Sequence, residues 1–114
     1  PAEFATIASA ADGLDWLYAF AKSRRKKFSV GEWGTAPGGK SNTNGENAEF
    51  IRWMHGWFAA HAHDLAYEAY FNNCTETEVQ SNLFRPKGPD CVRQNVTAAS
   101  TYRSLFGGAP RKLD

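Results

Sequence analysis

Residues 27–34 read KFSVGEWG, and the organisation of the whole chain can be worked out from this segment. The segment is short, rich in apolar residues and followed at once by a turn signal, so we predict a strand over Phe28–Trp33. A second run, rich in Tyr and Phe, predicts a strand over Leu65–Phe71. Helical periodicity lies between the two strands, which is the order of a parallel strand–helix–strand unit.

Three helices are predicted around these strands. The first is capped by Asp12, runs for about fourteen residues and ends in the basic run of residues 24–27. The second begins at Asn47, and the third runs from about Val96 to Phe106, where glycines stop it. The apolar stripes at helical spacing are Leu14, Leu17, Tyr18 and Ala21 in the first helix, and Phe50, Ile51, Met54, Trp57 and Phe58 in the second.

Two parallel strands cannot form a sheet with both faces buried, which parallel sheets require. A (β/α)8 barrel runs to roughly 250 residues, and the predicted element order matches its last quarter. We therefore expect an α/β fold in which residues 1–114 are a single segment, the C-terminal part of a (β/α)8 TIM barrel completed by another chain. The alternative is a small, self-sufficient α+β domain.

Composition excludes several classes of partner. Thirteen Lys and Arg residues against twelve Asp and Glu give a formal net charge of +1, so no electrostatic footprint for nucleic acid is present. No apolar run approaches the roughly 18 residues of a membrane span, and residues 1–11 lack the features of a signal peptide. Aromatic residues reach 14%, which favours a binding surface lined by some of the rings.

The two cysteines, Cys74 and Cys91, flank a polar segment rich in turn residues. Two cysteines at this spacing, with no histidines placed beside them, are too few ligands for a zinc site. A redox or nucleophilic role is one reading, but we predict a structural disulfide, which implies an oxidising compartment. Glycosylation sequons at Asn73 and Asn95 are compatible with secretion.

Glu32 is the candidate catalytic residue. In barrel enzymes the working residues lie at the carboxyl ends of strands, and Glu32 is the acidic residue at the end of the first predicted strand. A carboxylate there costs free energy to bury, so it needs a partner or a function. The plain structural alternative is an ion pair with an Arg.

KFSVGEWG resembles the seventh strand of clan A glycoside hydrolases, barrel enzymes with two catalytic glutamates. Residues 13–21 resemble the sixth helix of that barrel, residues 47–54 the seventh helix and residues 64–72 the eighth strand. Within the clan the chain is similar to the family 26 β-mannanase group, over about residues 12–107. The expected piece therefore runs from the sixth helix to the eighth.

The resemblance implies that Glu32 is the nucleophile of a secreted, retaining endo-β-1,4-glycanase acting on a mannan-type polysaccharide. The acid/base glutamate of the clan lies at the end of the fourth strand, which this chain does not contain, so another polypeptide would supply it. No cofactor and no metal are implied, because clan members work with carboxylates alone.

Four further residues are candidates for substrate contact. Glu68 alternates with Ala66 and Tyr70 on one face of its strand, where it contacts substrate or Glu32, or else forms a buried ion pair. Trp33, Tyr70 and Asn72 end the two strands and are expected to form the sugar platform, with Phe71 a weaker candidate. The histidines at 55, 61 and 63 are read as surface or helix-end residues.

Other classes of function remain open at this point. The chain could be a non-catalytic carbohydrate-binding module or a degenerate barrel fragment that keeps the aromatic platform. It could be a structural chain of a multi-chain enzyme, or an autonomous domain whose likeness to a hydrolase is accidental.

Overall fold

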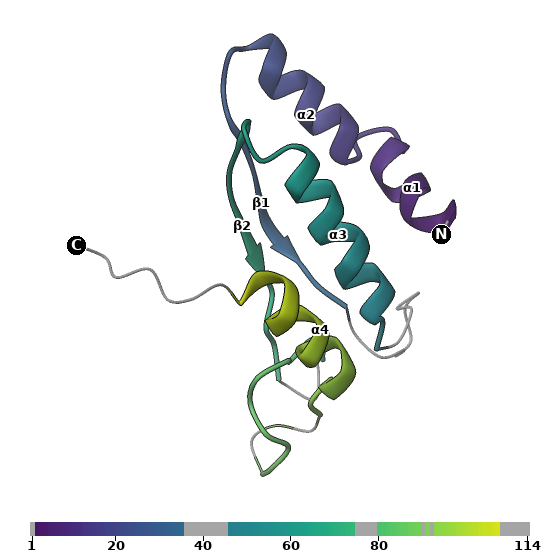
Figure 1. Cartoon of the computed structure of the whole chain (residues 1–114), viewed down its shortest axis with the longest axis vertical. Helices are drawn as coiled ribbons and strands as arrows, with labels where there is room; N and C mark the ends of the chain where they lie inside the picture. Colours follow the sequence, from purple (N-terminus) through teal and green to yellow (C-terminus); the bar gives the residue numbers. More distant parts are fainter. Residues whose placement is uncertain (1, 36–45, 75–79, 90, 92, 108–114) are drawn as a thin grey trace, which may run out of the picture.

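The structure, a computed structural model, describes residues 2–35, 46–74, 80–89, 91 and 93–107. Within them the order is α1 (Ala2–Ser9), α2 (Leu14–Ser23), β1 (Phe28–Trp33), α3 (Ala48–Ala60), β2 (Leu65–Tyr70) and α4 (Val96–Phe106) (Figure 1). Both predicted strands and all three predicted helices are confirmed, with α2 shorter than expected. Helix α1 was not predicted, and most of the loop predicted over residues 35–46 lies outside the described residues.

The start of α2 differs from the prediction. Its N-cap is Gly13, and Asp12 instead lies in the turn from α1 with a φ of 62°, in the left-handed region. A Cβ on Gly13 would lie 2.5 Å from the carbonyl oxygen of Ala8. Only glycine permits so close an approach of the two helices, so the cap moves one residue beyond Asp12.

The caps of α3 and α4 come from two adjacent residues just before α3. The second predicted helix was expected to begin at Asn47, and this residue is the N-cap of α3, its side chain accepting a hydrogen bond from the Phe50 N–H. At α4 the carboxylate of Glu46 accepts hydrogen bonds from the N–H groups of Thr97 and Ala98. A negative charge there complements the positive end of the helix dipole and holds α4 beside the start of α3.

The sheet consists of β1 and β2, which are parallel and joined through α3. Val30 pairs with Glu68 and Trp33 pairs with Tyr70. Between these pairs β1 has two residues, Gly31 and Glu32, whereas β2 has only Ala69. This is a β-bulge, which bends the strand and re-aims the side chains that follow it.

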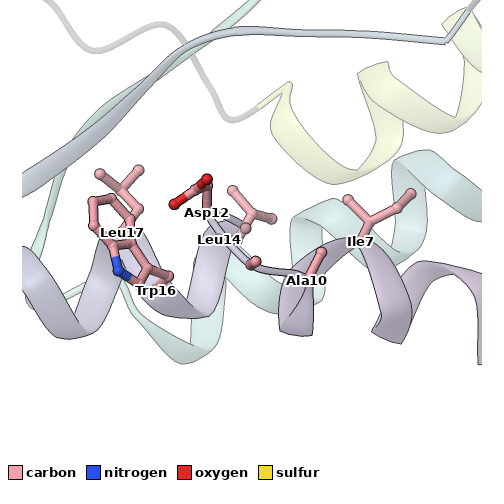
Figure 2. A pocket seen from close by; sticks show the side chains of 8 residues that line it. Ile7, Ala10, Asp12, Leu14, Trp16 and Leu17 are labelled. Atoms are coloured by element: carbon pink, nitrogen blue, oxygen red, sulfur yellow. The ribbon is translucent and has the colours of Figure 1, made fainter.

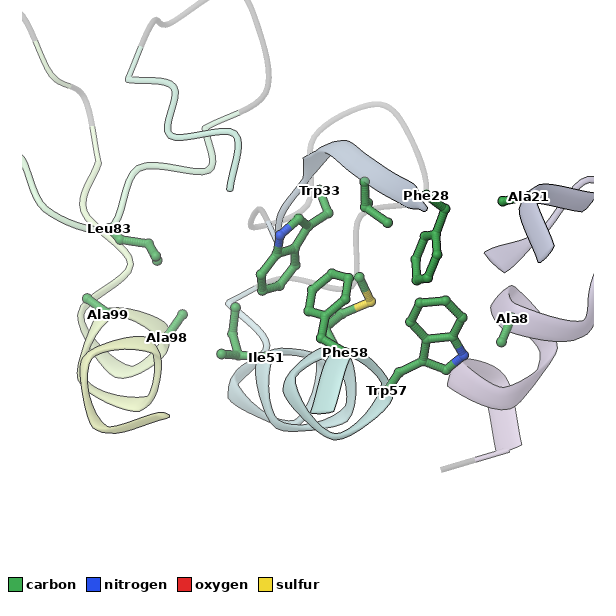
Figure 3. Close-up of a cluster of buried hydrophobic side chains, with 12 residues drawn as sticks. Ala8, Ala21, Phe28, Trp33, Ile51, Trp57, Phe58, Leu83, Ala98 and Ala99 are labelled. Atoms are coloured by element: carbon green, nitrogen blue, oxygen red, sulfur yellow. The ribbon is translucent and has the colours of Figure 1, made fainter. Parts of the chain in front are cut away.

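One face of the sheet is covered by helices. Phe28 and Trp33 of β1 point toward α3, which buries a stripe of large side chains against them (Figure 3), and Val30 belongs to the same buried cluster. The buried stripe on α3 is the predicted one, with Ile51, Met54, Trp57 and Phe58 buried and Phe50 partly buried. Ala8 and Ala21 extend the core on the side of α1 and α2, and Leu83, Ala98 and Ala99 extend it on the side of α4.

The expectation of a barrel segment was wrong. Among the described residues the chain forms a small α/β structure whose two strands pair only with each other. A barrel fills the face opposite its helices with layers of branched apolar side chains. Here that face carries Gly31 and Glu32, both exposed, and Tyr67, which is 58% exposed. The polarity and openness of this face do not fit the packed interior of a barrel.

The segment after β2 is held by a disulfide and a buried amide network. Cys74 and Cys91 are bonded, with their Cα atoms 4.9 Å apart, which confirms the predicted pair. Asn95 is fully buried, and its Nδ2 donates to the carbonyl oxygens of Gln80 and Asn82. In the parts of the chain that are described, every helix is too short or too polar to cross a bilayer.

Removing the disulfide is expected to lower the free energy of unfolding by about 3 kcal/mol, because the bond restricts a loop in the unfolded chain. The two cysteines are 17 residues apart in sequence. Urea denaturation of the Cys74→Ser/Cys91→Ser variant beside the parent protein measures this loss. Reductant should destabilise the parent by a similar amount and leave the variant unchanged. Equal stability of the variant and the oxidised parent would contradict the prediction.

Candidate functional site at the carboxyl end of the sheet

Glu32 lies at the carboxyl end of β1 on the open face of the sheet. The bulge at Gly31 and Glu32 turns this side chain outward, and both residues are exposed. None of the ion pairs among the described residues involves Glu32. The alternative expectation, an ion pair between Glu32 and an Arg, therefore does not explain its position. β-Bulges are over-represented next to active sites, where they re-aim a side chain.

Aromatic side chains flank Glu32 across the strand pair. Ala69 lies opposite the bulge. Tyr67 is two residues before Ala69 on the same strand, and Phe71 is two residues after it. They therefore share the open face with Glu32, since residues two apart in a strand point the same way. Tyr67 is 58% exposed and Phe71 is 36% exposed. Sequence reasoning did not single out Tyr67, although its alternation with Glu68 already placed it on the face opposite that residue.

Glu68 lies on the other face of the sheet, beneath the helices. Its carboxylate accepts a hydrogen bond from Nε1 of Trp33 and is also hydrogen-bonded to Tyr102 of α4. Glu68 is half-buried, and its partners are an indole N–H and a phenol rather than a cation. The structure therefore does not bring Glu32 and Glu68 together, and none of the ion pairs between described residues includes Glu68.

Trp33 is part of the core. Its side chain is 7% exposed, so little of the indole is accessible to a sugar. Its ring lies within 6.3 Å, centroid to centroid, of five other rings, those of Phe50, Phe58, Tyr70, Tyr102 and Phe106. The exposed rings on the face of Glu32 are those of Tyr67 and Phe71.

Tyr70 connects the carboxyl end of the sheet to the neighbouring loops by hydrogen bonds to Thr35 and Ser81. Its hydroxyl donates to the carbonyl oxygen of Ser81 at 2.9 Å, and the carbonyl oxygen of Thr35 lies 3.2 Å from the same hydroxyl. Burial raises the pKa of Tyr70 to about 12. Burial, together with the negative charge of Glu68, raises the pKa of Tyr102 to about 12 as well. Both phenols therefore stay protonated at neutral pH and act as hydrogen-bond donors.

Asn72 is engaged by the loop that follows β2. Its Oδ1 accepts from the Leu83 N–H at 2.7 Å, and its Nδ2 donates to Oδ1 of Asn82 at 3.3 Å. These bonds position residues 82–85 beside the carboxyl end of the sheet. The side-chain amide thus builds the rim of the candidate site.

Metal-binding residues do not gather at the site. In the described ranges no three His, Cys, Asp or Glu side chains lie close enough together to hold a metal ion. His61 ends α3 with its ring stacked on Trp57 at a centroid distance of 4.1 Å, and His63 is exposed beside Asp64. The surface or helix-end positions expected of these two histidines are confirmed.

Comparison with known proteins adds no relative to this picture. No family model matches the chain, and neither a curated protein nor a solved structure matches it at a significant level.

Proposed function

We propose that Glu32 is the nucleophile of a retaining glycosidase that acts on a β-1,4-linked, mannan-type polysaccharide. The observation that carries the proposal is the bulge at the carboxyl end of β1, which exposes this carboxylate on the same face of the sheet as the exposed rings of Tyr67 and Phe71. The resemblance of KFSVGEWG to the nucleophile strand of clan A enzymes supports the same residue. The disulfide fits secretion, because such bonds persist in oxidising compartments.

The exposed rings are suited to hold a sugar near the carboxylate. Pyranose rings present apolar C–H faces that stack on aromatic side chains, and Tyr67 and Phe71 offer such surfaces on the face of Glu32. A sugar stacked there would have its anomeric carbon within reach of a carboxylate that no described cation neutralises.

Retention requires two displacements. Glu32 attacks the anomeric carbon, the glycosidic bond breaks, and a second carboxyl group donates its proton to the departing oxygen. The resulting glycosyl ester of Glu32 is then hydrolysed by water, which that second group, now a carboxylate, deprotonates. The two carboxyl groups of such an enzyme lie about 5–5.5 Å apart.

The second carboxyl group has to come from outside the described residues. Glu68 lies on the helix-covered face, bonded to Trp33, so it cannot protonate a leaving group on the open face. Among the described residues each strand also has one unpaired edge, and the open face is exposed at Glu32 and Tyr67. Another polypeptide that extends the sheet and covers this face would supply both the acid/base group and the missing burial.

A non-catalytic carbohydrate-binding or interaction chain is the second candidate. One observation favours it. In the described part of the two strands, two exposed aromatic rings share the open face with Glu32, but no second carboxylate does. Binding by stacking needs only the rings.

Covalent trapping on the assembled protein separates the two candidates. A 2-deoxy-2-fluoro-mannoside with an activated leaving group should leave its sugar bonded to the nucleophile. Trypsin cleavage after Lys27 and Lys40 releases residues 28–40, in which Glu32 is the only carboxylate side chain. We expect the mass increase on this peptide, with residues 41–52, which contain Glu46 and Glu49, as the internal control.

Three outcomes are informative. A label on residues 28–40 supports the proposal, and a label on another peptide of an active protein overturns it. If the protein binds mannan but neither cleaves it nor takes up the label, the binding candidate replaces the enzyme.

A further inference from the structure

The outer face of α1 and α2 exposes large apolar side chains. Trp16 and Phe20 are 51% and 46% exposed, and their rings are stacked with centroids 5.3 Å apart. Ile7 on α1 is 44% exposed. A hollow of about 530 Å³ lies where the two helices meet, and Ile7, Asp12, Leu14 and Trp16 are among the residues that line it (Figure 2). Contiguous exposed apolar surface of this kind marks an interaction site.

Opposite charges stand at the two ends of this face. Asp12 lines the hollow beside Trp16, and the guanidinium of Arg24 lies 5.4 Å from the centre of the Phe20 ring. None of the ion pairs between described residues uses Asp12 or Arg24. Along the chain the order is therefore acid, ring, ring, base, with each residue four positions after the last.

This order is self-complementary. Asp12 and Arg24 are equally far in sequence from Tyr18, and so are Trp16 and Phe20. If two copies of α2 lie antiparallel about a two-fold axis at the level of Tyr18, Asp12 of each copy faces Arg24 of the other. The same axis sets Trp16 of each copy against Phe20 of the other, so one alignment satisfies both the charges and the rings.

We propose that the face formed by Ile7, Asp12, Trp16, Phe20 and Arg24 joins two copies of this chain in a closed, two-fold symmetric dimer. The hollow beside Asp12 receives the aromatic edge of the other copy, and burial of the exposed rings supplies the attraction. The two charge pairs select the antiparallel alignment over the parallel one, in which like charges would meet. This surface lies on the helices, away from Glu32, so it is independent of the proposed chemistry.

The test measures the mass of the protein by sedimentation equilibrium over a range of concentrations. The parent should approach twice its 12.6 kDa mass as concentration rises. Arg24→Glu places Glu against Asp12 twice in each dimer, and Asp12→Lys places Lys against Arg24 twice. Each variant should raise the dissociation constant of the dimer about tenfold or more, and the difference should shrink at high salt.

Mixing the two variants gives the sharpest arm of the test. In a mixed dimer the unchanged Asp12 faces the unchanged Arg24 of the other chain, and the new Glu faces the new Lys. Both charge pairs are then restored, so the mixture should associate more tightly than either variant alone. Asp12→Asn removes the charge while tolerating the left-handed backbone at this position, and circular dichroism checks that each variant folds.

Arg103→Glu is the matched control. It reverses a cation that also lies over an exposed phenylalanine, 5.6 Å from the centre of the Phe84 ring, but on α4. This variant should dimerise like the parent. A parent that stays monomeric at every concentration overturns the proposal. So do charge variants as dimeric as the parent, or a mixture that fails to associate.

Discussion

Replacing Glu32 with glutamine is expected to lower the kcat of mannan hydrolysis by at least about a thousandfold, the scale on which loss of a nucleophile acts. Glutamine keeps the volume of the side chain but cannot form the glycosyl ester. Because Glu32 is exposed and forms no ion pair with the described residues, the fold and the binding of the polysaccharide should be retained. Initial rates on soluble mannan, with glucan and xylan for comparison, and calorimetric binding measure both properties in the assembled protein.

Glu49→Gln is the control for this experiment. Glu49 is also an exposed glutamate, in the first turn of α3, where it pairs with Arg52. This substitution should leave the hydrolysis rate unchanged. A Glu32→Gln protein that hydrolyses mannan as fast as the parent would falsify the assignment of the nucleophile.

Replacing Trp33 with alanine is expected to lower the free energy of unfolding by about 4 kcal/mol, because it empties a site in a packed core. The indole is 7% exposed, and removing it also takes from Glu68 the Nε1–H donor that its carboxylate uses. A half-buried carboxylate without that donor adds to the loss. Urea denaturation, extrapolated to water, measures the difference.

Two other tryptophan variants make this result interpretable. Trp33→Phe keeps most of the ring contacts but removes the N–H, so it should lie between the parent and the alanine variant. Trp16→Ala removes the same side-chain type from a position 51% exposed and should cost less than about 1 kcal/mol in dilute protein. If Trp33→Ala costs no more than Trp16→Ala, the core position of Trp33 is wrong.

The strands were predictable from the sequence, but the faces on which their side chains lie were not. Strict alternation from Phe28 and Val30 would place Glu32 on the helix-covered face and Trp33 on the open one. The extra residue at Gly31 and Glu32 exchanges the two, so the glutamate is exposed and the indole is buried. A bulge depends on pairing with β2, which no local pattern in β1 records.

Contacts between residues distant in sequence could not be predicted from the sequence either. The Glu46 carboxylate caps α4 through Ala98, 52 residues further along the chain. Asp12 has the residue type of an N-cap, yet the close approach of α1 to Gly13 assigns that position to the glycine. In both cases packing between helices, rather than local propensity, decides which group caps the helix.

The burial of Asn95 has a consequence for the maturation of the protein. The sequon at residues 95–97 presents an acceptor amide, but in the folded chain its Nδ2 is committed to two carbonyl oxygens and has no exposed surface. A sugar attached to this nitrogen would occupy the space of residues 80–82. Attachment and closure of this loop therefore exclude each other: a chain modified here before it folds cannot adopt this structure, and a folded chain offers no acceptor.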